Sequence, residues 1–256
     1  MFATKPALAR RMLGRALDAG VPAAWVTGDE VYGADPGLRA DLERRRTGYV
    51  LAVAASHRVA TAAGTCPAGR LAARLPRRAW QRYSAGPGAK GHRYYDWAWA
   101  VIDPGRPGHR WLLIRRNRRT RELAFYRCCS PRLVPLPVLV TVAGTRWTTE
   151  ENFQAGKQLT GLDDHQVRRW DSWYRWTTLA MLALAFLSIT AAAEHTRPPP
   201  EDQIPLTRNE IAALFSTLIT GPAKDARHRL RWSAWRRRHQ HRARVCHYRR
   251  QAADDP

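Results

Sequence analysis

Arg146, Glu150 and Lys157 are spaced so that one helix would carry all three side chains on the same face. Lys157 and Glu150 lie eleven and four residues from Arg146. At about 100° per residue these offsets return to within about 40° of one direction. A carboxylate between two cations suits metal-assisted phosphodiester chemistry, because the carboxylate can ligate a divalent ion while the cations bind DNA phosphates. In isolation, the favoured interpretation of the triplet is an exposed helix face stabilised by local ion pairs.

The overall charge favours a polyanionic partner. The 256 residues carry 43 Lys+Arg against 21 Asp+Glu, which gives a formal net charge of +22. Such a field attracts nucleic acid, because each phosphate that a cation neutralises releases condensed counterions. We therefore predict that the chain binds DNA.

Two features bear on the compartment. The four cysteines form no CxxC pair and have no regular spacing, which argues against a zinc site or a disulfide framework. Residues 1–20 carry charges throughout and lack the apolar region of a signal peptide. We expect a reduced, cytoplasmic protein.

The uncharged run at residues 176–193 approaches membrane-spanning length. It contains Thr and Ser, is rich in Ala, and continues a helical pattern that carries Arg and Asp. We interpret it as a buried core helix and expect no membrane partner. A membrane span is the less favoured alternative.

The first part of the chain alternates between helix and strand. Residues 3–19 form an amphipathic pattern, and an apolar strand at residues 23–27 runs into Gly28 and Asp29. Asp35 and Pro36 then begin a second helix, as N-cap and first helical residue, and residues 48–55 read as a buried strand. This alternation predicts a parallel α/β sheet with its active residues at the carboxyl ends of the strands. Asp29 occupies that position.

Residues 56–131 read as a β-rich insertion into this core. Strand-like runs occur at residues 94–102, 110–115 and 122–128, and the last two flank a basic hairpin tip. The tip is either a grip for the phosphate backbone or a solvated turn; its candidate DNA contacts are Arg116, Arg118 and Arg119. Four tryptophans of this segment pack in the core or stack on unpaired bases, with core packing the favoured interpretation: Trp80, Trp97, Trp99 and Trp111.

The remainder is predicted to be helical. One helix carries Glu150, a turn follows at residues 161–164, and a long helix begins at about His165. Beyond a small helix at residues 206–220, residues 227–250 contain ten Arg, four His, two Trp and one Tyr, with no acid. That composition favours nucleic-acid binding, the alternative being a disordered solubilising tail. Its central candidate contacts are Arg236, Arg237 and Arg238.

Three stretches resemble a known family. They are residues 25–33 (WVTGDEVYG), the Arg146/Glu150/Lys157 spacing, and residues 161–175, from GLD to WYR. They are similar to DDE transposases of the insertion sequence 701 family, which belongs with the insertion sequence 4 type elements and their Tyr-Arg-Glu-Lys motif. The resemblance extends over nearly the whole chain, from the FATKP start to the Arg-rich tail. It implies an α/β, RNase H-like (ribonuclease H-like) fold with a β-rich insertion before the final catalytic helix.

The resemblance also implies roles for individual residues. Asp29 corresponds to the second catalytic Asp and Glu150 to the catalytic Glu, both ligands of Mg²⁺ or Mn²⁺. Arg146 and Lys157 correspond to the phosphate-binding residues of the motif, whereas its Tyr falls at Ala143. In the family the first Asp lies on a strand upstream of the helix that begins this chain. We therefore expect an N-terminally truncated transposase, in which the loss of the early strands leaves the strands at residues 23–27 and 48–55 with unpaired neighbours.

A rival assignment makes Asp29 the first ligand and Asp103 the second. Two-metal phosphoryl transfer needs a bridging carboxylate, and under the favoured assignment only Asp29 and Glu150 are present, so we expect a transposase fragment that is catalytically incomplete alone. The alternatives are a non-catalytic DNA-binding remnant that inhibits transposition and an unrelated basic membrane-associated protein. The expected partners are element ends and target DNA, a second copy of the chain or full-length transposase, at the bacterial nucleoid.

This interpretation divides the chain into four segments. Residues 1–55 are a partial RNase H-like core and residues 56–131 the β-rich insertion. Residues 132–195 contain the catalytic-Glu helix and the long core helix. Residues 196–256 contain the small helix and the basic tail.

Overall fold

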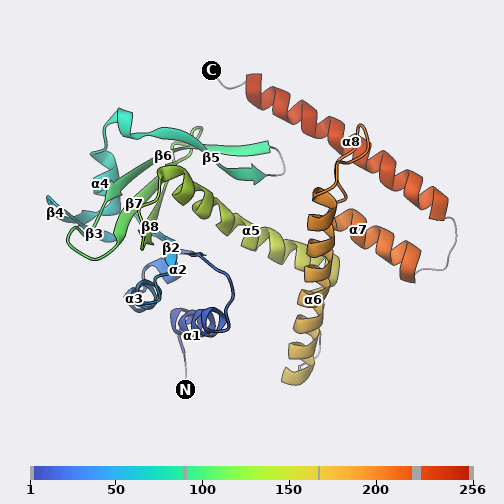
Figure 1. The fold of residues 1–256 in the computed structure, drawn as a ribbon, viewed down its shortest axis with the longest axis horizontal. Helices are drawn as coiled ribbons and strands as arrows, with labels where there is room; N and C mark the ends of the chain where they lie inside the picture. Colours follow the sequence, from blue (N-terminus) through green and yellow to red (C-terminus); the bar gives the residue numbers. More distant parts are fainter. Residues whose placement is uncertain (1–2, 89–90, 167, 221–225, 254–256) are drawn as a thin grey trace. The chain divides into compact units, whose positions relative to one another are not determined.

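The computed structural model describes residues 3–88, 91–166, 168–220 and 226–253, and it divides into two compact units (Figure 1). The first unit comprises Met1–Gly88 and His92–Trp147, and the second comprises Ala89–Gly91 and Thr148–Pro256. The boundary at Trp147 falls inside the helix α5 (Leu136–Thr160). Each unit is described below by itself.

The first unit begins with the expected order of helix and strand. Its first elements are α1 (Lys5–Asp18), β1 (Trp25–Gly28), α2 (Glu30–Gly33), α3 (Pro36–Arg44) and β2 (Gly48–Val53). The predicted start of α3 is confirmed, because the Asp35 carboxylate accepts a hydrogen bond from the Leu38 amide at 2.6 Å and Pro36 opens the helix. The single-turn helix α2 was not predicted from the sequence.

Mostly β-structure follows. The elements are β3 (Arg58–Thr61), β4 (Gly64–Pro67), α4 (Ala68–Ala73), the 3₁₀ turn η1 (Arg77–Ala79), β5 (Gln81–Gly88), β6 (Gly91–Val101), β7 (His109–Arg116) and β8 (Leu123–Ser130). The last three confirm the three strand-like runs. In contrast, β5 lies in a stretch whose Gly, Pro and Arg content gave no strand signal.

These strands form one mixed sheet and a separate hairpin. The six-stranded sheet has the order β1-β2-β8-β7-β6-β5, and β3 pairs with β4. The α/β class is confirmed, and so is the parallel pairing predicted from the helix–strand alternation, which concerns β1 and β2. Only β1 and β2 run parallel among the described pairings, because a helical crossover joins them, whereas short turns join β6, β7 and β8 and force antiparallel pairing. The pairing of β2 with β8 joins residues 1–55 and 56–131 in this sheet.

Both faces of the sheet are covered. On one face the N-terminal turns of α5 pack on Trp97, Trp111 and Leu113. On the other face α4 covers the β7 residues Leu112 and Ile114, and α3 covers β2. Successive strand residues point to opposite faces, so the alternation along β7 supplies both cores. The core interpretation is confirmed for Trp97 and Trp111, which are almost completely buried.

The second unit is helical. It contains the C-terminal part of α5, α6 (Trp170–His195), α7 (Arg208–Phe215), the π-helical turn η2 (Ser216–Thr220) and α8 (Ala226–Ala253). Its buried cluster consists of Leu187, Ala191 and Ile211, with Leu159 and Leu206 packed against it. The basic tail is therefore a helix in the structure, and the disordered alternative is wrong for residues 226–253, which contain no Gly or Pro.

The helix α6 differs from the prediction in two ways. It begins at Trp170 rather than at about His165, and among its described side chains only Ala180, Leu187 and Ala191 are buried. The interpretation of this segment as a buried core helix is wrong for most of its length, because the small cluster at Leu187 covers one side of α6 only. Among the described helices, α6 is the one long and apolar enough to cross a membrane.

Candidate functional site

Asp29 lies at the carboxyl end of β1, as the sequence predicted. Its Oδ1 atom accepts a hydrogen bond from the Val31 amide at 3.0 Å, so the carboxylate caps the helix α2. Within the described part of the chain, Oδ2 makes no hydrogen bond. Asp29 is half-buried. A carboxylate oxygen in this position suits a hard divalent cation such as Mg²⁺.

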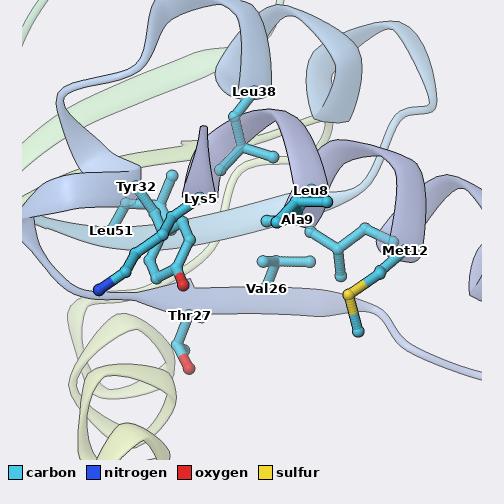
Figure 2. Close-up of a pocket in the computed structure, with 10 residues that line it drawn as sticks. Lys5, Leu8, Ala9, Met12, Val26, Thr27, Tyr32, Leu38 and Leu51 are labelled. Carbon is cyan, nitrogen blue, oxygen red and sulfur yellow. The ribbon is translucent and has the colours of Figure 1, made fainter. Parts of the chain in front are cut away.

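An apolar cavity of about 440 Å³ lies between α1 and β1. Figure 2 shows Leu8 and Met12 of α1 facing Val26 of β1, with Lys5 and Tyr32 toward one end. The helix α1 is amphipathic, and the residues of its apolar face line this cavity. None of its described residues is buried. The cavity is a poor candidate for phosphate binding, because its lining is largely apolar. It lies beside β1, which forms one edge of the described sheet, as expected. The expectation of an unpaired neighbour is wrong for β2, which pairs with β1 and with β8.

A single helix, α5, carries the charged triplet. Arg146 lies in the part that belongs to the first unit, and Glu150 and Lys157 lie in the part that belongs to the second. Glu150 is exposed, and the Lys157 Nζ atom lies 3.8 Å from the Asp163 carboxylate. Asp29 and Glu150 therefore belong to different units.

Three arginines surround a cavity of about 200 Å³ in the first unit. Arg146 lines it together with Arg93 and Arg115, and aromatic rings complete the wall without any acidic residue. The guanidinium of Arg93 donates to the carbonyls of Ala85 and Gly144 at 2.9 and 3.3 Å. The Nε atoms of Arg93 and Arg115 are buried without a hydrogen-bond partner in the described structure. An orphaned N–H beside converging cations favours the binding of an anion.

Two aromatic rings of the cavity wall lie against these guanidinium groups. The Arg115 guanidinium lies 4.7 Å from the Tyr95 ring centre, and that of Arg93 lies 5.7 Å from the Trp147 ring. Burial raises the pKa of Tyr126, and the positive charges of Arg115 and Arg146 oppose that rise. Arg93 and Arg115 were not among the site residues predicted from the sequence. The signal was the period-two pattern of β6, which places Arg93 and Tyr95 on one strand face.

The basic hairpin tip is more constrained than the sequence suggested. Arg116 donates to Asp96 at 2.9 Å and lies 4.0 Å from the Trp80 ring centre. Arg118 lies 3.8 Å from the same carboxylate. Arg119 is exposed and its guanidinium has no partner among the described residues. Of the three predicted contacts, Arg119 is therefore the one best placed to reach a phosphate.

The three predicted contacts on α8 also differ in whether their guanidinium groups are bonded within the second unit or exposed to solvent. Arg236 donates to both carboxylate oxygens of Glu210 at 2.6 and 3.0 Å, and Arg237 donates to the Ile204 carbonyl at 2.8 Å. These two side chains attach α8 to the rest of the second unit. The exposed Arg238 makes only a long contact of 3.4 Å with the Ala234 carbonyl of its own helix. Arg238 is the member of the triplet whose side chain is exposed to solvent.

Asp103, the rival ligand, is held in a mostly buried ion pair with Arg127. Among the described residues, no group of three or more His, Cys, Asp and Glu side chains is close enough together to hold a metal ion. The carboxylates of Asp29 and Glu150 are nevertheless the donor type that Mg²⁺ and Mn²⁺ prefer. Both residues are accessible to solvent.

The chain matches no protein-family model, and no curated protein matches it.

Proposed function

We propose that this chain is a DDE-type transposase component that binds DNA and contributes Asp29 and Glu150 to a Mg²⁺-dependent site for strand cleavage and transfer. The observation that carries the proposal is the position of Arg146, Glu150 and Lys157 on the helix α5, in the order of the Tyr-Arg-Glu-Lys motif. The proposal also assigns an RNase H-like fold to the mixed sheet and its helices.

The residues have separate tasks in this proposal. Asp29 and Glu150 supply oxygen ligands, and Arg146 binds a DNA phosphate together with Arg93 and Arg115 around their shared cavity. Lys157 adds a second phosphate contact. Bound Mg²⁺ or Mn²⁺ supplies the charge that stabilises the attacking and leaving oxygens of phosphoryl transfer. The resemblance calls for a third carboxylate beside these two. The proposed partners are element ends and target DNA at the bacterial nucleoid, a second copy of the chain, and full-length transposase.

Metal binding tests the assignment of ligands without requiring catalysis. We would titrate Mn²⁺ into the protein and follow the free ion by electron paramagnetic resonance, comparing wild type with Asp29→Asn and Glu150→Gln. Asparagine also caps helices, so Asp29→Asn keeps the cap of α2 while it removes the charge. We expect each variant to weaken Mn²⁺ binding by about tenfold or more. Changes to residues that only hydrogen-bond to metal ligands already weaken binding by this much, so the loss of a ligand should do at least the same.

Glu151→Gln is the matched control, because Glu151 is the exposed neighbour of Glu150 on the same helix. It should change Mn²⁺ binding by less than about twofold, within the effect of one exposed surface charge. If Glu151→Gln weakened binding as much as Glu150→Gln, the assignment of Glu150 as a ligand would be wrong.

A second candidate function is non-catalytic: the chain occupies element ends and inhibits transposition. It is favoured by one observation, namely that the arginine cavity and the exposed face of α8 include neither Asp29 nor Glu150. The two functions differ in a strand-transfer assay with full-length transposase. Inhibition that persists in Asp29→Asn and Glu150→Gln would support the inhibitor, whereas a contribution to strand transfer that these changes abolish would support the catalytic function.

A further inference from the structure

Three aromatic rings form an exposed ladder along α8. The ring centres of Trp232 and Trp235 are 4.8 Å apart with planes 6° from parallel, and those of Trp235 and His239 are 5.3 Å apart at 10°. Trp232 and Trp235 are each about half exposed, at 49% and 48%. Their spacing of three and four residues places the rings on one helix face.

A stripe of arginines runs beside this ladder. Helical rotation of about 100° per residue places five arginines within about 35° of one direction, some 80° from the direction of the ladder. All five side chains are exposed, and α8 contains no acidic residue. The arginine stripe consists of Arg227, Arg231, Arg238, Arg242 and Arg249.

The opposite side of α8 fixes the orientation of both features. Ser233 is buried, Arg236 is bonded to Glu210, and Arg237 is bonded to the Ile204 carbonyl. These contacts attach one side of the helix to the second unit, where α8 appears as a single long helix (Figure 1). The ladder and the stripe therefore remain on the solvent side in the second unit.

We propose that this face of α8 binds single-stranded nucleic acid, with unpaired bases stacked on the Trp232–Trp235–His239 ladder and phosphates bound by the arginine stripe. Flat rings beside regularly spaced cations match a strand whose bases are free to stack and whose backbone is anionic. A duplex offers the same phosphates but keeps its bases within its own stack. The inference rests on the proposed nucleic-acid binding and needs neither Asp29 nor Glu150.

The test compares three probes at one salt concentration by fluorescence anisotropy: a dT oligonucleotide, an abasic oligonucleotide of the same length, and a duplex. Base stacking contributes about 1–3 kcal/mol per base. The variant Trp232→Leu/Trp235→Leu, which keeps apolar bulk, should therefore weaken binding of the dT oligonucleotide by about tenfold or more. Its binding of the abasic oligonucleotide should change by less than about twofold, since backbone contacts supply that affinity.

Two controls separate stacking from general effects. Trp170→Leu/Trp173→Leu removes another exposed, stacked tryptophan pair, with ring centres 5.1 Å apart on α6, and should leave dT binding unchanged. Arg231→Gln/Arg238→Gln/Arg242→Gln should reduce the slope of log affinity against log salt by about two for single strands, at about 0.7 per contact. Far-UV circular dichroism checks that each variant keeps its helices.

The outcomes distinguish this inference from the proposed function. Equal affinity of the wild-type protein for dT and abasic probes, or equal losses in the two tryptophan variants, would overturn base stacking while leaving DNA binding intact. Failure of the wild-type protein to bind any of the three probes would overturn DNA binding itself. A loss confined to the dT probe and to Trp232→Leu/Trp235→Leu would support the inference.

Discussion

Neighbouring arginines on α8 should respond differently to the same substitution. Arg236→Gln removes a bidentate partner of Glu210, which is almost completely buried, whereas Arg238→Gln removes an exposed cation. Breaking a fully buried ion pair costs about 3–5 kcal/mol, because it leaves an uncompensated buried charge. The side chain of Arg236 is 35% exposed, so we reduce the expected cost to about 2–3 kcal/mol.

The two variants separate in two assays. For a folding unit of roughly 100 residues, about 2–3 kcal/mol lowers Tm by about 8–24 °C, so thermal unfolding should detect Arg236→Gln readily. Arg238→Gln should leave Tm within about 2 °C and should reduce the slope of log affinity against log salt by about 0.9 for duplex DNA. Glu210→Gln/Arg236→Gln should recover part of the stability, because both charges are removed together.

The result that would refute this reasoning is an exchange of the two phenotypes. If Arg236→Gln reduced the salt slope at a temperature where it is fully folded, while Arg238→Gln lowered Tm, the assignment of Arg236 as an internal anchor would be wrong.

Gly144→Ala and Glu43→Gln test the packing of the first unit, and Gly156→Ala in the second unit is the control for the former. A Cβ atom on Gly144 would lie 2.0 Å from the Ala85 carbonyl oxygen, so Gly144→Ala should cost about 1–3 kcal/mol in denaturant unfolding. In Gly156→Ala, on the part of the same helix that lies in the second unit, the new Cβ meets only side chains, Leu162 at 3.2 Å and Leu184 at 3.6 Å, among the described residues. This change should be neutral or stabilising by up to about 1 kcal/mol. Equal losses in the two variants would contradict the packing of α5. Burial acts to raise the pKa of Glu43, but hydrogen bonds from Arg110 and Tyr49 outweigh it, so its pKa lies below the ordinary value. The ionised Glu43 therefore stabilises the folded state above the unfolded pKa of about 4.3, and this contribution is lost as pH falls through the folded pKa. Glu43→Gln should lower the free energy of unfolding at pH 7 and flatten its decrease in acid. A curve of unfolding free energy against pH that is unchanged in the variant would contradict the ion pair.

Local signals in the sequence predicted the elements that hold the candidate residues. Asp35 followed by Pro36 marks the start of α3, and the apolar run before Gly28 becomes β1. The strand-like runs around the basic tip become β7 and β8. Arg146, Glu150 and Lys157 indeed share the helix α5. These features depend on residues within a few positions of one another, which is why a pattern along the chain is sufficient to find them.

Only the tertiary structure decided which charged groups are available. The sequence presents Arg236 and Arg238 as equals, but Glu210, 26 residues from Arg236, engages only the former. Arg116 is similarly engaged by Asp96, and Arg110 by Glu43, which is 67 residues away. The strand order also depends on contacts between residues far apart in the chain, because β2 pairs with β8. Such partners are selected by packing between segments far apart in the chain, and no periodicity or local propensity encodes them.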